Sequence, residues 1–400
     1  MDNYGIYKHL CTDNSYVSLA KTLSSAASTE ATQKTIKRIT KDNIVYAHMG
    51  QLIIKDGICY ASFIENPGND SELHDSSTSR VVLAVFELAR VTSSDFDVDS
   101  DITFYKVGGK GDFCAGHKAV SIFKDNSMCL VGDTLYVCFS FIAEDGNSHI
   151  FSKSFDIKTS KWGKEAIVSL LYKGKVYDFS DKSLNEIYVD KGAAPNALGL
   201  IELVSAWNEY EGEYYATGIT IEQANNGFIV KTTDFSVMEI VDVIPFNENG
   251  MAEIASYIYK DRLFVACRQD YGIPYLILGV LNLKTMIWEH NFKIPDGNSR
   301  PWFFKYRDEL YLINTVEERK RRYATISHVR ILKEPQPFFN YQHPIESVLT
   351  LKSCGSYFAT AEYNADIYYV ASHKTESFGK LCIKIYDEDE VNKKLLSMFS

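Results

Sequence analysis

Pairs of short apolar stretches, each pair joined by a tight turn, recur along most of this chain. Leu52–Phe63 (LIIKDGICYASF) is one example, and an aromatic residue, here Tyr60, follows the turn three or four positions later. A turn of the Asp-Gly type between alternating apolar residues predicts a β-hairpin, because Gly and Asp tolerate the positive φ that such a turn requires. The six turns fall at Asp56, Asp133, Glu211, Asp261, Asp308 and Cys354.

The spacing of these turns predicts one repeated unit. Successive turns are 77, 78, 50, 47 and 46 residues apart, and the shorter intervals suit a four-stranded blade. Two more strands follow each hairpin, and the matching phrases Asp156–Trp162 (DIKTSKW) and Asn282–Trp288 (NLKTMIW) occupy the same place in two repeats. We therefore predict an all-β chain that forms a six-bladed β-propeller of four-stranded antiparallel blades over residues 46–388. A five-bladed propeller and an irregular β-sandwich are the alternatives.

Both ends of the chain lie outside this repeat. Residues 1–45 are expected to form an N-terminal extension, in which Tyr16–Thr40 is rich in Ala, Ser, Thr and Lys and suits a helix or an arm. Residues 389–400 are expected to form a C-terminal tail. A homo-oligomer assembled through residues 1–45 is one expectation for the quaternary structure.

Charge and composition narrow the classes of partner. The formal net charge of −10 argues against a nucleic-acid partner, which requires a basic surface, and against adhesion to an anionic membrane. The chain lacks an apolar run of about 18 residues that would predict a membrane span. Its first residues lack the basic and apolar regions of a secretory signal. The localisation stays open among the cytoplasm, a virion and secretion with the signal removed.

The cysteines predict no metal site. Eight are present, and neither a CxxC motif nor a Cys/His pair with zinc spacing occurs. Cys59, Cys138 and Cys267 lie inside apolar strands, which predicts buried, reduced thiols. We therefore expect neither a metal nor another cofactor.

Ionisable residues recur at one position of the repeat, eight residues before each turn. In a propeller this position lies where the innermost strand of a blade begins near the central axis, on the face where ligands bind. Burying unpaired charge is costly, so charged residues there indicate either a solvated channel or a functional site. The residues are His48, Asp125, Leu203 with its neighbour Glu202, Glu253, Arg300 and Glu346.

The same face is expected to carry residues that contact a ligand. A planar guanidinium binds a carboxylate through two parallel hydrogen bonds, so Arg268 and Arg300 suit an acidic sugar or another carboxylate. Loops after the second strand of each repeat add further polar residues, such as Glu65. The other candidates for ligand contacts are Asp270, Trp302, Glu362, Tyr363 and His117.

Carboxylates on this face suggest glycosidic bond cleavage. Two carboxylates across a sugar can hydrolyse the bond, one as the acid and the other as the base or nucleophile. The candidates are Asp125, Glu202, Glu253 and Glu346. His48 and His117 are candidate acid/base groups because imidazole titrates near neutral pH, although a lone histidine is also a common structural residue.

The repeat resembles the sialidase-like propellers, and more loosely the five-bladed glycoside hydrolases and the propeller polysaccharide lyases. The resembling segments include Lys124–Phe139 (KDNSMCLVGDTLYVCF), Val265–Gly272 (VACRQDYG) and Ser299–Ile313 (SRPWFFKYRDELYLI). Sialidases use three arginines for the substrate carboxylate, a Tyr–Glu nucleophile pair and an Asp acid/base. The chain departs from that family because it lacks the Ser-x-Asp-x-Gly-x-x-Trp box, a FRIP-like start and an identifiable third arginine.

By position, the resemblance implies roles for several of the candidate residues. Arg268 and Arg300 match two of the arginines, and Asp125 matches the acid/base. Glu202 or Glu253, together with Tyr363, matches the nucleophile pair.

Three functions remain open at this point. The first is a sialidase-like glycosidase that acts on a glycan, including an acidic one, at an axial pocket. The second is a non-catalytic propeller that binds a glycan or receptor, such as a phage tail or virion component. The third is a polysaccharide lyase that acts on a uronic-acid glycan through His48 or His117 and a tyrosine.

Overall fold

The computed structural model describes most of the chain between Gln33 and Tyr386. The described residues are 33–44, 46–67, 78–91, 93–194, 200–203, 205–221, 226–246, 250–269, 275–295, 299–306, 308–315, 323–329, 345–352, 356–364, 366–373 and 380–386. The side chains of some of these residues, Asp125 and Glu346 among them, are not described. The expected C-terminal tail and residues 1–32 of the expected extension lie outside the described residues.

The described strands form six sheets, and the first three differ in size. The first sheet contains β2 (Tyr46–Lys55), β3 (Ile58–Asn66), β4 (Arg80–Glu87) and β5 (Thr103–Gly109). The second contains β6 (Phe113–Cys114), β7 (His117–Val131), β8 (Thr134–Ala143), β9 (Ser148–Asp156) and β10 (Lys161–Ile167). The third contains β11 (Ser169–Tyr172), β12 (Lys175–Asp178), β13 (Leu200–Leu203), β14 (Asn208–Tyr210), β15 (Glu213–Ile221), β16 (Asn226–Thr232) and β17 (Val237–Ile244).

The last three sheets each have four antiparallel strands, as does the first. The fourth contains β18 (Met251–Tyr259), β19 (Arg262–Gln269), β20 (Tyr275–Asn282) and β21 (Ile287–Pro295). The fifth contains β22 (Trp302–Tyr306), β23 (Glu309–Thr315), β24 (Tyr323–Val329) and β25 (Ile345–Lys352). The sixth contains β26 (Ser356–Tyr363), β27 (Asp366–His373), β28 (Lys380–Tyr386) and β1 (Gln33–Arg38). The described helices are α3 (Leu88–Val91), α4 (Val98–Asp101) and α5 (Asp181–Asp190).

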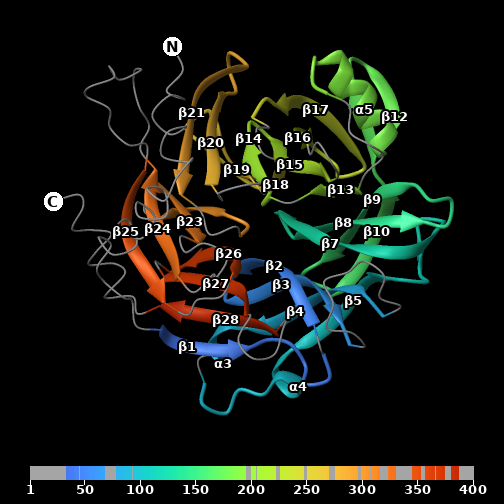
Figure 1. The fold of residues 1–400 in the computed structure, drawn as a ribbon. Helices are drawn as coiled ribbons and strands as arrows, with labels where there is room; N and C mark the ends of the chain where they lie inside the picture. The colour runs from blue at the N-terminus through green and yellow to red at the C-terminus, as the bar shows by residue number, and fades with distance from the viewer. Residues whose placement is uncertain are drawn as a thin grey trace.

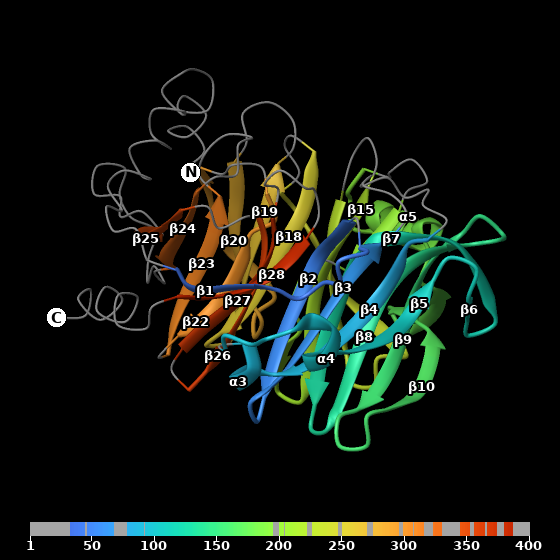
Figure 2. The ribbon, with the colours of Figure 1, turned by 90° about the horizontal axis from the view of Figure 1, so that it is seen from below.

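The sheets have a propeller arrangement, which confirms the predicted all-β class. In Figure 1 they follow one another around a common centre in chain order, and Figure 2 shows the strands of the first two sheets side by side, seen from below. The strands nearest the centre form a closed ring of contacts. β2 contacts β7 and β26, β7 contacts β13, β15 contacts β18, and β22 contacts both β18 and β26.

Apolar side chains fill the spaces between neighbouring sheets. One buried cluster joins the first and second sheets through residues such as Leu83 and Phe139, and another joins the fourth and fifth through Leu276 and Leu312. Both faces of a middle strand are therefore buried, as in β19, where every residue after Arg262 is buried. Fully burying one such Leu or Phe stabilises the fold by roughly 1.5–3 kcal/mol.

The predicted hairpin turns are present in five sheets, but the sixth is misplaced. Asp56, Glu211, Asp261 and Asp308 have positive φ in the turns of their hairpins, and Asp133 lies between β7 and β8. The segment around Cys354 instead connects β25 of the fifth sheet to β26 of the sixth. The sixth hairpin joins β26 to β27.

That sixth hairpin turns at Asn364, which has a φ of 50°. Asn is one of the residues that tolerate this conformation most readily.

The N-terminal boundary of the sheet structure also differs from the expected one. Gln33–Arg38, within the expected extension, forms β1 and pairs with β28 as the outer strand of the sixth sheet. Figure 1 shows β1 beside β28. The chain thus contributes strands from both of its ends to one sheet, which closes the ring.

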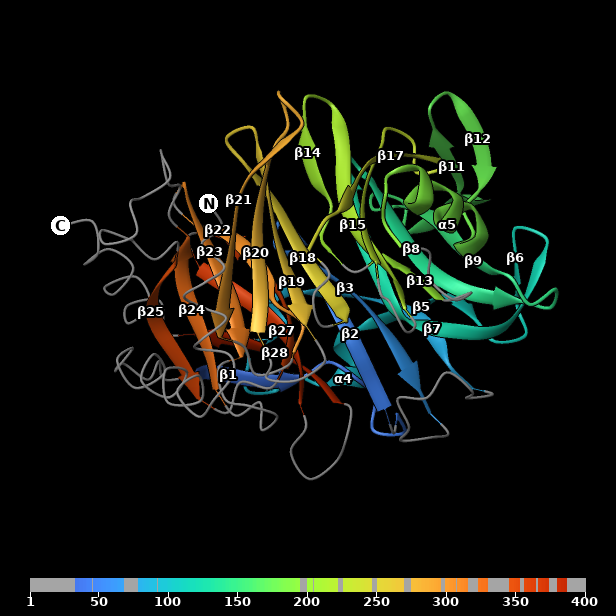
Figure 3. The ribbon, with the colours of Figure 1, turned by 45° about the horizontal axis from the view of Figure 1, so that its top comes forward.

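The long interval between the second and third turns contains an insertion. It holds β11, β12 and α5, which lie together at one edge of the third sheet (Figure 3). The hydroxyl of Ser180 caps the start of α5 by accepting from Ser183 N, and Leu184, Ile187 and Tyr188 form its buried face. None of the described helices is long and apolar enough to cross a bilayer.

Candidate functional site

Four inner strands, one from each of four sheets, are irregular near the end at which they begin. Their pairing shifts between His48 and Gln51 in β2, between Ile122 and Asn126 in β7, between Met251 and Ile254 in β18, and between Ser356 and Ala359 in β26. Bulges of this kind redirect side chains and often lie next to functional sites. We call the end of the molecule where these four strands begin the entry face.

Three of the predicted ring residues lie in these irregular segments. They are His48, Asp125 and Glu253. In these three sheets, the position eight residues before the hairpin turn therefore lies in a β-bulge of the inner strand. The side chain of Asp125 is outside the described part of the structure.

An ion pair links the bulge of β18 to the end of β19. Arg268 Nη1 donates to Glu253 Oε2, and the two side chains are only 9% and 13% exposed. Charge-assisted hydrogen bonds of this kind are stronger than neutral ones, and burial reduces their screening by water. The pair places one cation and one anion at the entry face of the fourth sheet.

Arg300 is fully buried and crosses between sheets. Its Nη2 donates to the carbonyl oxygen of Gly50 in the first sheet at 2.9 Å. Its guanidinium carbon lies 5.2 Å from the ring centroid of Trp302, which is itself buried. The expected pair of arginines that both face an open cavity is therefore not observed, because Arg300 instead ties the fifth sheet to the first.

The bulge of β2 is held from two sides. Met49 has a φ of 56°, and its carbonyl oxygen accepts from Asn126 Nδ2 of the second sheet at 2.7 Å. Ser62 donates to the same asparagine through its hydroxyl. The carbonyl oxygen of the next residue, Gly50, accepts from Arg300 of the fifth sheet. The successive carbonyls of Met49 and Gly50 therefore connect the first sheet to the second and to the fifth. His48, next to them, is buried and lies 5.6 Å from the ring of Tyr46.

Buried hydroxyls continue these connections around the ring. Ser256 Oγ donates to Ser205 Oγ at 3.0 Å, and Ser205 Oγ accepts from Thr217 N at 2.8 Å. Trp207 Nε1 donates to Ser127 Oγ of the second sheet at 3.1 Å. Satisfied buried polar groups hold inner strands in one register, so the entry face has a rigid base.

A second ion pair, between a buried glutamate and a partly exposed arginine, lies at the entry face of the first sheet. Arg80 donates to Glu65 Oε1 from both Nε and Nη2, at 2.7 and 2.6 Å. Burial raises the pKa of Glu65, and the guanidinium of Arg80 opposes this increase. Glu65 could be noticed from the sequence only as one of several loop carboxylates, and Arg80 carried no signal because it lies outside the repeat position.

Glu346 does not belong to the ring. It lies on β25, where it pairs with His328, so it is on the outer strand of the fifth sheet. The prediction was wrong because the turn used to locate it, at Cys354, connects two sheets. Of the other candidate carboxylates, Glu202 is buried on β13, and Asp270 lies outside the described residues.

Glu362 and Tyr363 lie at the opposite end of the molecule from the entry face. They end β26 beside the turn at Asn364. The Tyr363 hydroxyl lies 3.4 Å from where a Cβ on Gly57, in the hairpin turn of the first sheet, would be. They therefore lie away from the face on which the sequence placed them, since β26 is the first strand of its sheet and runs in the direction opposite to the one assumed.

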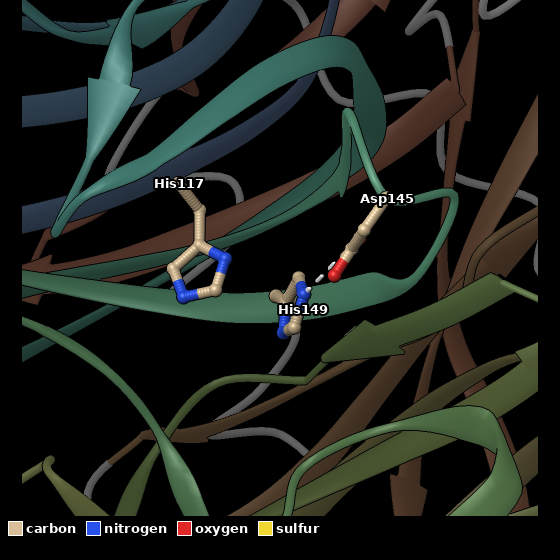
Figure 4. Close-up of side chains that lie close together, drawn as sticks. All are labelled: His117, Asp145 and His149. Carbon is tan, nitrogen blue, oxygen red and sulfur yellow. Dashed lines mark ion pairs between the residues drawn. The ribbon is translucent and has the colours of Figure 1, made fainter.

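Two histidines and one aspartate converge at the end of the second sheet where β7 begins and β8 turns into β9. Figure 4 shows His149 between His117 and Asp145. One potential ligand atom from each of the three side chains lies within 4.8 Å of the other two. The sequence indicated His117 as a candidate and Asp145 as one of several loop carboxylates, but it did not connect them with His149, because the three become neighbours only when β8 and β9 fold back. Among the described residues, this is the group best able to hold a metal ion.

A cavity of about 450 Å³ lies between the outer strands of the third and fourth sheets. Its lining includes Lys191, Asn226, Asp242 and Trp288. Lys191 Nζ lies 3.0 Å from an oxygen of Asp242, and Trp288 Nε1 donates to the other oxygen at 3.1 Å. The polar groups of this cavity are thus paired with one another, and the cavity is separate from the ring of inner strands.

Comparison with known proteins supports the fold alone. No protein-family model and no curated protein sequence matches the chain. The structure is similar to Trypanosoma rangeli sialidase, with a TM-score of 0.60 and 10% identity over 92% of this chain and 60% of that one. The same sialidase in complex with sialic acid has a TM-score of 0.58. A Hadza microbial sialidase has a TM-score of 0.59 and 9% identity, over 89% of this chain and 68% of that one.

Proposed function

We propose that the chain is a six-bladed propeller and that it hydrolyses a glycan bearing a carboxylate at the entry face, as a sialidase-like glycosidase. The observation that carries this proposal is the mostly buried Arg268–Glu253 pair at the bulge of an inner strand. The fold-level likeness to sialidases supports it. The closed ring of contacts from β2 to β26 supports counting each of the six sheets as one blade.

The ion pair suggests how binding and chemistry could be coupled. A substrate carboxylate that takes the guanidinium of Arg268 would displace Glu253 from it. The released carboxylate could then act at the anomeric carbon as the nucleophile or as the base for a water molecule. Asp125, at the corresponding bulge of β7, would protonate the leaving oxygen. Glu202 is the second candidate for the role of Glu253.

Turnover of a glycan panel that includes a fluorogenic sialoside tests this proposal. Asp125→Asn should lower kcat by about 100-fold or more, which is typical for loss of a general acid. Glu253→Gln should lower kcat, whereas Arg268→Lys should mainly raise KM because it loses the two-point contact. Glu362→Gln, exposed at the opposite end, is the matched control. Absence of turnover on every glycan, with binding unchanged in all three variants, would reject the proposal.

The second candidate is a propeller that binds a glycan or receptor without cleaving it. The burial of Arg300 and Trp302 and the engagement of Glu253 by Arg268 favour it, because these groups serve internal contacts. It predicts that the wild-type protein and Asp125→Asn bind the same glycan with equal Kd and release no product. A lyase would instead release an unsaturated product from a uronic-acid polymer.

A further inference from the structure

The His117, Asp145 and His149 cluster is assembled by two hairpins of the second sheet. His117 is the first residue of β7, Asp145 lies in the turn between β8 and β9, and His149 is the second residue of β9. The strand pairing brings these positions together, since Ala119 pairs with Ala143 and Phe141 with His149. The ends of two strands and one turn therefore supply three potential metal ligands to a single point.

The separations suit one ion after small side-chain rotations. His149 Nε2 lies 3.9 Å from Asp145 Oδ1, and the imidazole centroids of His117 and His149 lie 4.8 Å apart. Ligands bound to a common Zn²⁺ at about 2.1 Å each lie roughly 3.4 Å from one another. His117 and Asp145 are partly or largely exposed, so they can rotate by the required distance toward the more buried His149.

His149 provides an independent sign that a ligand is bound here. Its side chain is only 8% exposed, and neither ring nitrogen has a hydrogen-bond partner within the described part of the chain. Leaving a buried polar group unsatisfied is unfavourable, and a metal ion would satisfy one of the nitrogens. Burial, followed by the neighbouring His117, lowers the pKa of His149, which is the direction that favours the neutral, metal-binding form.

The aspartate is already oriented. Asn147 donates to both oxygens of Asp145, from its backbone N and from Nδ2, each at 2.9 Å. These bonds lower the pKa of Asp145 and keep it ionised. Outer hydrogen bonds of this kind fix the ligands of metal sites. Asp178 and Asp181 interact electrostatically with His149 and add negative potential that favours a cation.

We propose that His117, Asp145 and His149 bind one divalent transition-metal ion of the zinc class, with a fourth position open to water. Two imidazoles and a carboxylate are a ligand set that zinc accepts, and three protein ligands leave one position free. The ion would clip the start of β7 to the turn between β8 and β9. It would thereby brace this end of the second sheet independently of any glycan.

Calorimetric titration of the chelator-treated protein with Zn²⁺ tests the site. We expect one ion per chain and a higher Tm in its presence, because the metal binds only the folded state. His117→Gln, Asp145→Asn and His149→Gln should each weaken Zn²⁺ binding at least tenfold, and Asn147→Ala about tenfold. Asp133→Asn, in the turn at the other end of the same sheet, is the matched control and should bind Zn²⁺ as the wild type does.

Cobalt gives a second readout, since Co²⁺ in place of Zn²⁺ reports its ligands through visible absorption. If His149→Gln does not fold, the two more exposed positions still decide the question. The proposal is overturned if wild-type protein binds no Zn²⁺, or if His117→Gln and Asp145→Asn bind it with wild-type affinity. In that case, His149 is a packing residue whose ring lies tilted against the rings of Phe141 and His117.

Discussion

At the scale of single residues, the type and chain position of the polar groups could be predicted, but their partners could not. The eight-residue offset located His48, Asp125 and Glu253 at the bulges of inner strands. It could not show that Arg268 neutralises Glu253, because that pairing depends on how β18 and β19 shift past one another. Nor could it show that Arg300 is buried, since its acceptor lies 250 residues away in the first sheet.

The buried Glu65 makes stability depend on pH. Burial raises the pKa of its carboxyl above the value of about 4.3 in an unfolded chain, so the folded state holds the proton more tightly. The protonated carboxyl of Glu65 contributes fully to the free energy of unfolding below the unfolded pKa. This contribution is lost as the pH rises through the pKa of the folded state. Glu65→Gln stays neutral and can still accept from Arg80. The free energy of unfolding of this variant should therefore fall less than that of the wild type between about pH 4 and pH 7.

Urea unfolding at several pH values measures this difference. Glu87→Gln, exposed at the far end of β4, is the control and should keep the wild-type pH profile. Parallel profiles for Glu65→Gln and the wild type would show that Glu65 does not carry this pH dependence.

At the scale of elements, short turn patterns in the sequence predicted where hairpins form. They were less reliable for assigning each hairpin to the correct sheet. An Asp or Gly turn between apolar strands identified five hairpins because the required positive φ restricts the residue type. The Cys354 segment resembles such a turn, yet it joins two sheets. In the sequence, a connection between two sheets resembles a turn within one sheet, and Asn364 marks the true turn of the sixth hairpin. The errors at Glu346, Glu362 and Tyr363 all follow from this ambiguity.

The close packing of β15 predicts a severe effect at one glycine. A Cβ on Gly218 would lie 2.3 Å from Phe228 Cζ and 2.7 Å from the backbone oxygen of Glu202. The backbone of β13 cannot move without losing its pairing with β15, so Gly218→Ala should cost about 3 kcal/mol. Gly212→Ala, in the hairpin turn of the same sheet, has open space and a φ of 82°, so it should cost only about 1 kcal/mol.

Chemical denaturation of the two glycine variants gives both values. Equal losses of stability would mean that β13 and Phe228 relax freely around the new methyl group, contrary to this prediction.

At the scale of the whole molecule, the repeat predicted the propeller arrangement but not how the ring closes. Each hairpin signal is local, whereas closure joins residues from the two ends of the chain. β1 lies in a segment whose composition suited a helix or an arm, and its pairing with β28 overrides that local preference. The metal cluster was missed for a similar reason, since His117 and His149 are brought together by strand pairing and not by sequence spacing.

Closure through β1 predicts that a few residues stabilise the entire ring. A chain that begins at Gln33 retains β1, whereas one that begins at Ile39 lacks it and still keeps the fully buried Ile39 side chain. Five residues of β1 are in register with β28, and backbone hydrogen bonds contribute about 0.5–1.5 kcal/mol each. The shorter chain should therefore be less stable by about 3 kcal/mol. The edge of β28 that it uncovers should also promote self-association.

Comparing the urea midpoints and light scattering of the two chains measures both effects. A peptide of residues 33–38, added in trans, should raise the midpoint of the shorter chain because it can refill the vacant edge. A peptide of the same composition in scrambled order is the control and should leave the midpoint unchanged. Equal midpoints for the two chains would mean that the contacts among β2, β22 and β26 close the ring without β1, and the stabilising role assigned here to β1 would then be wrong.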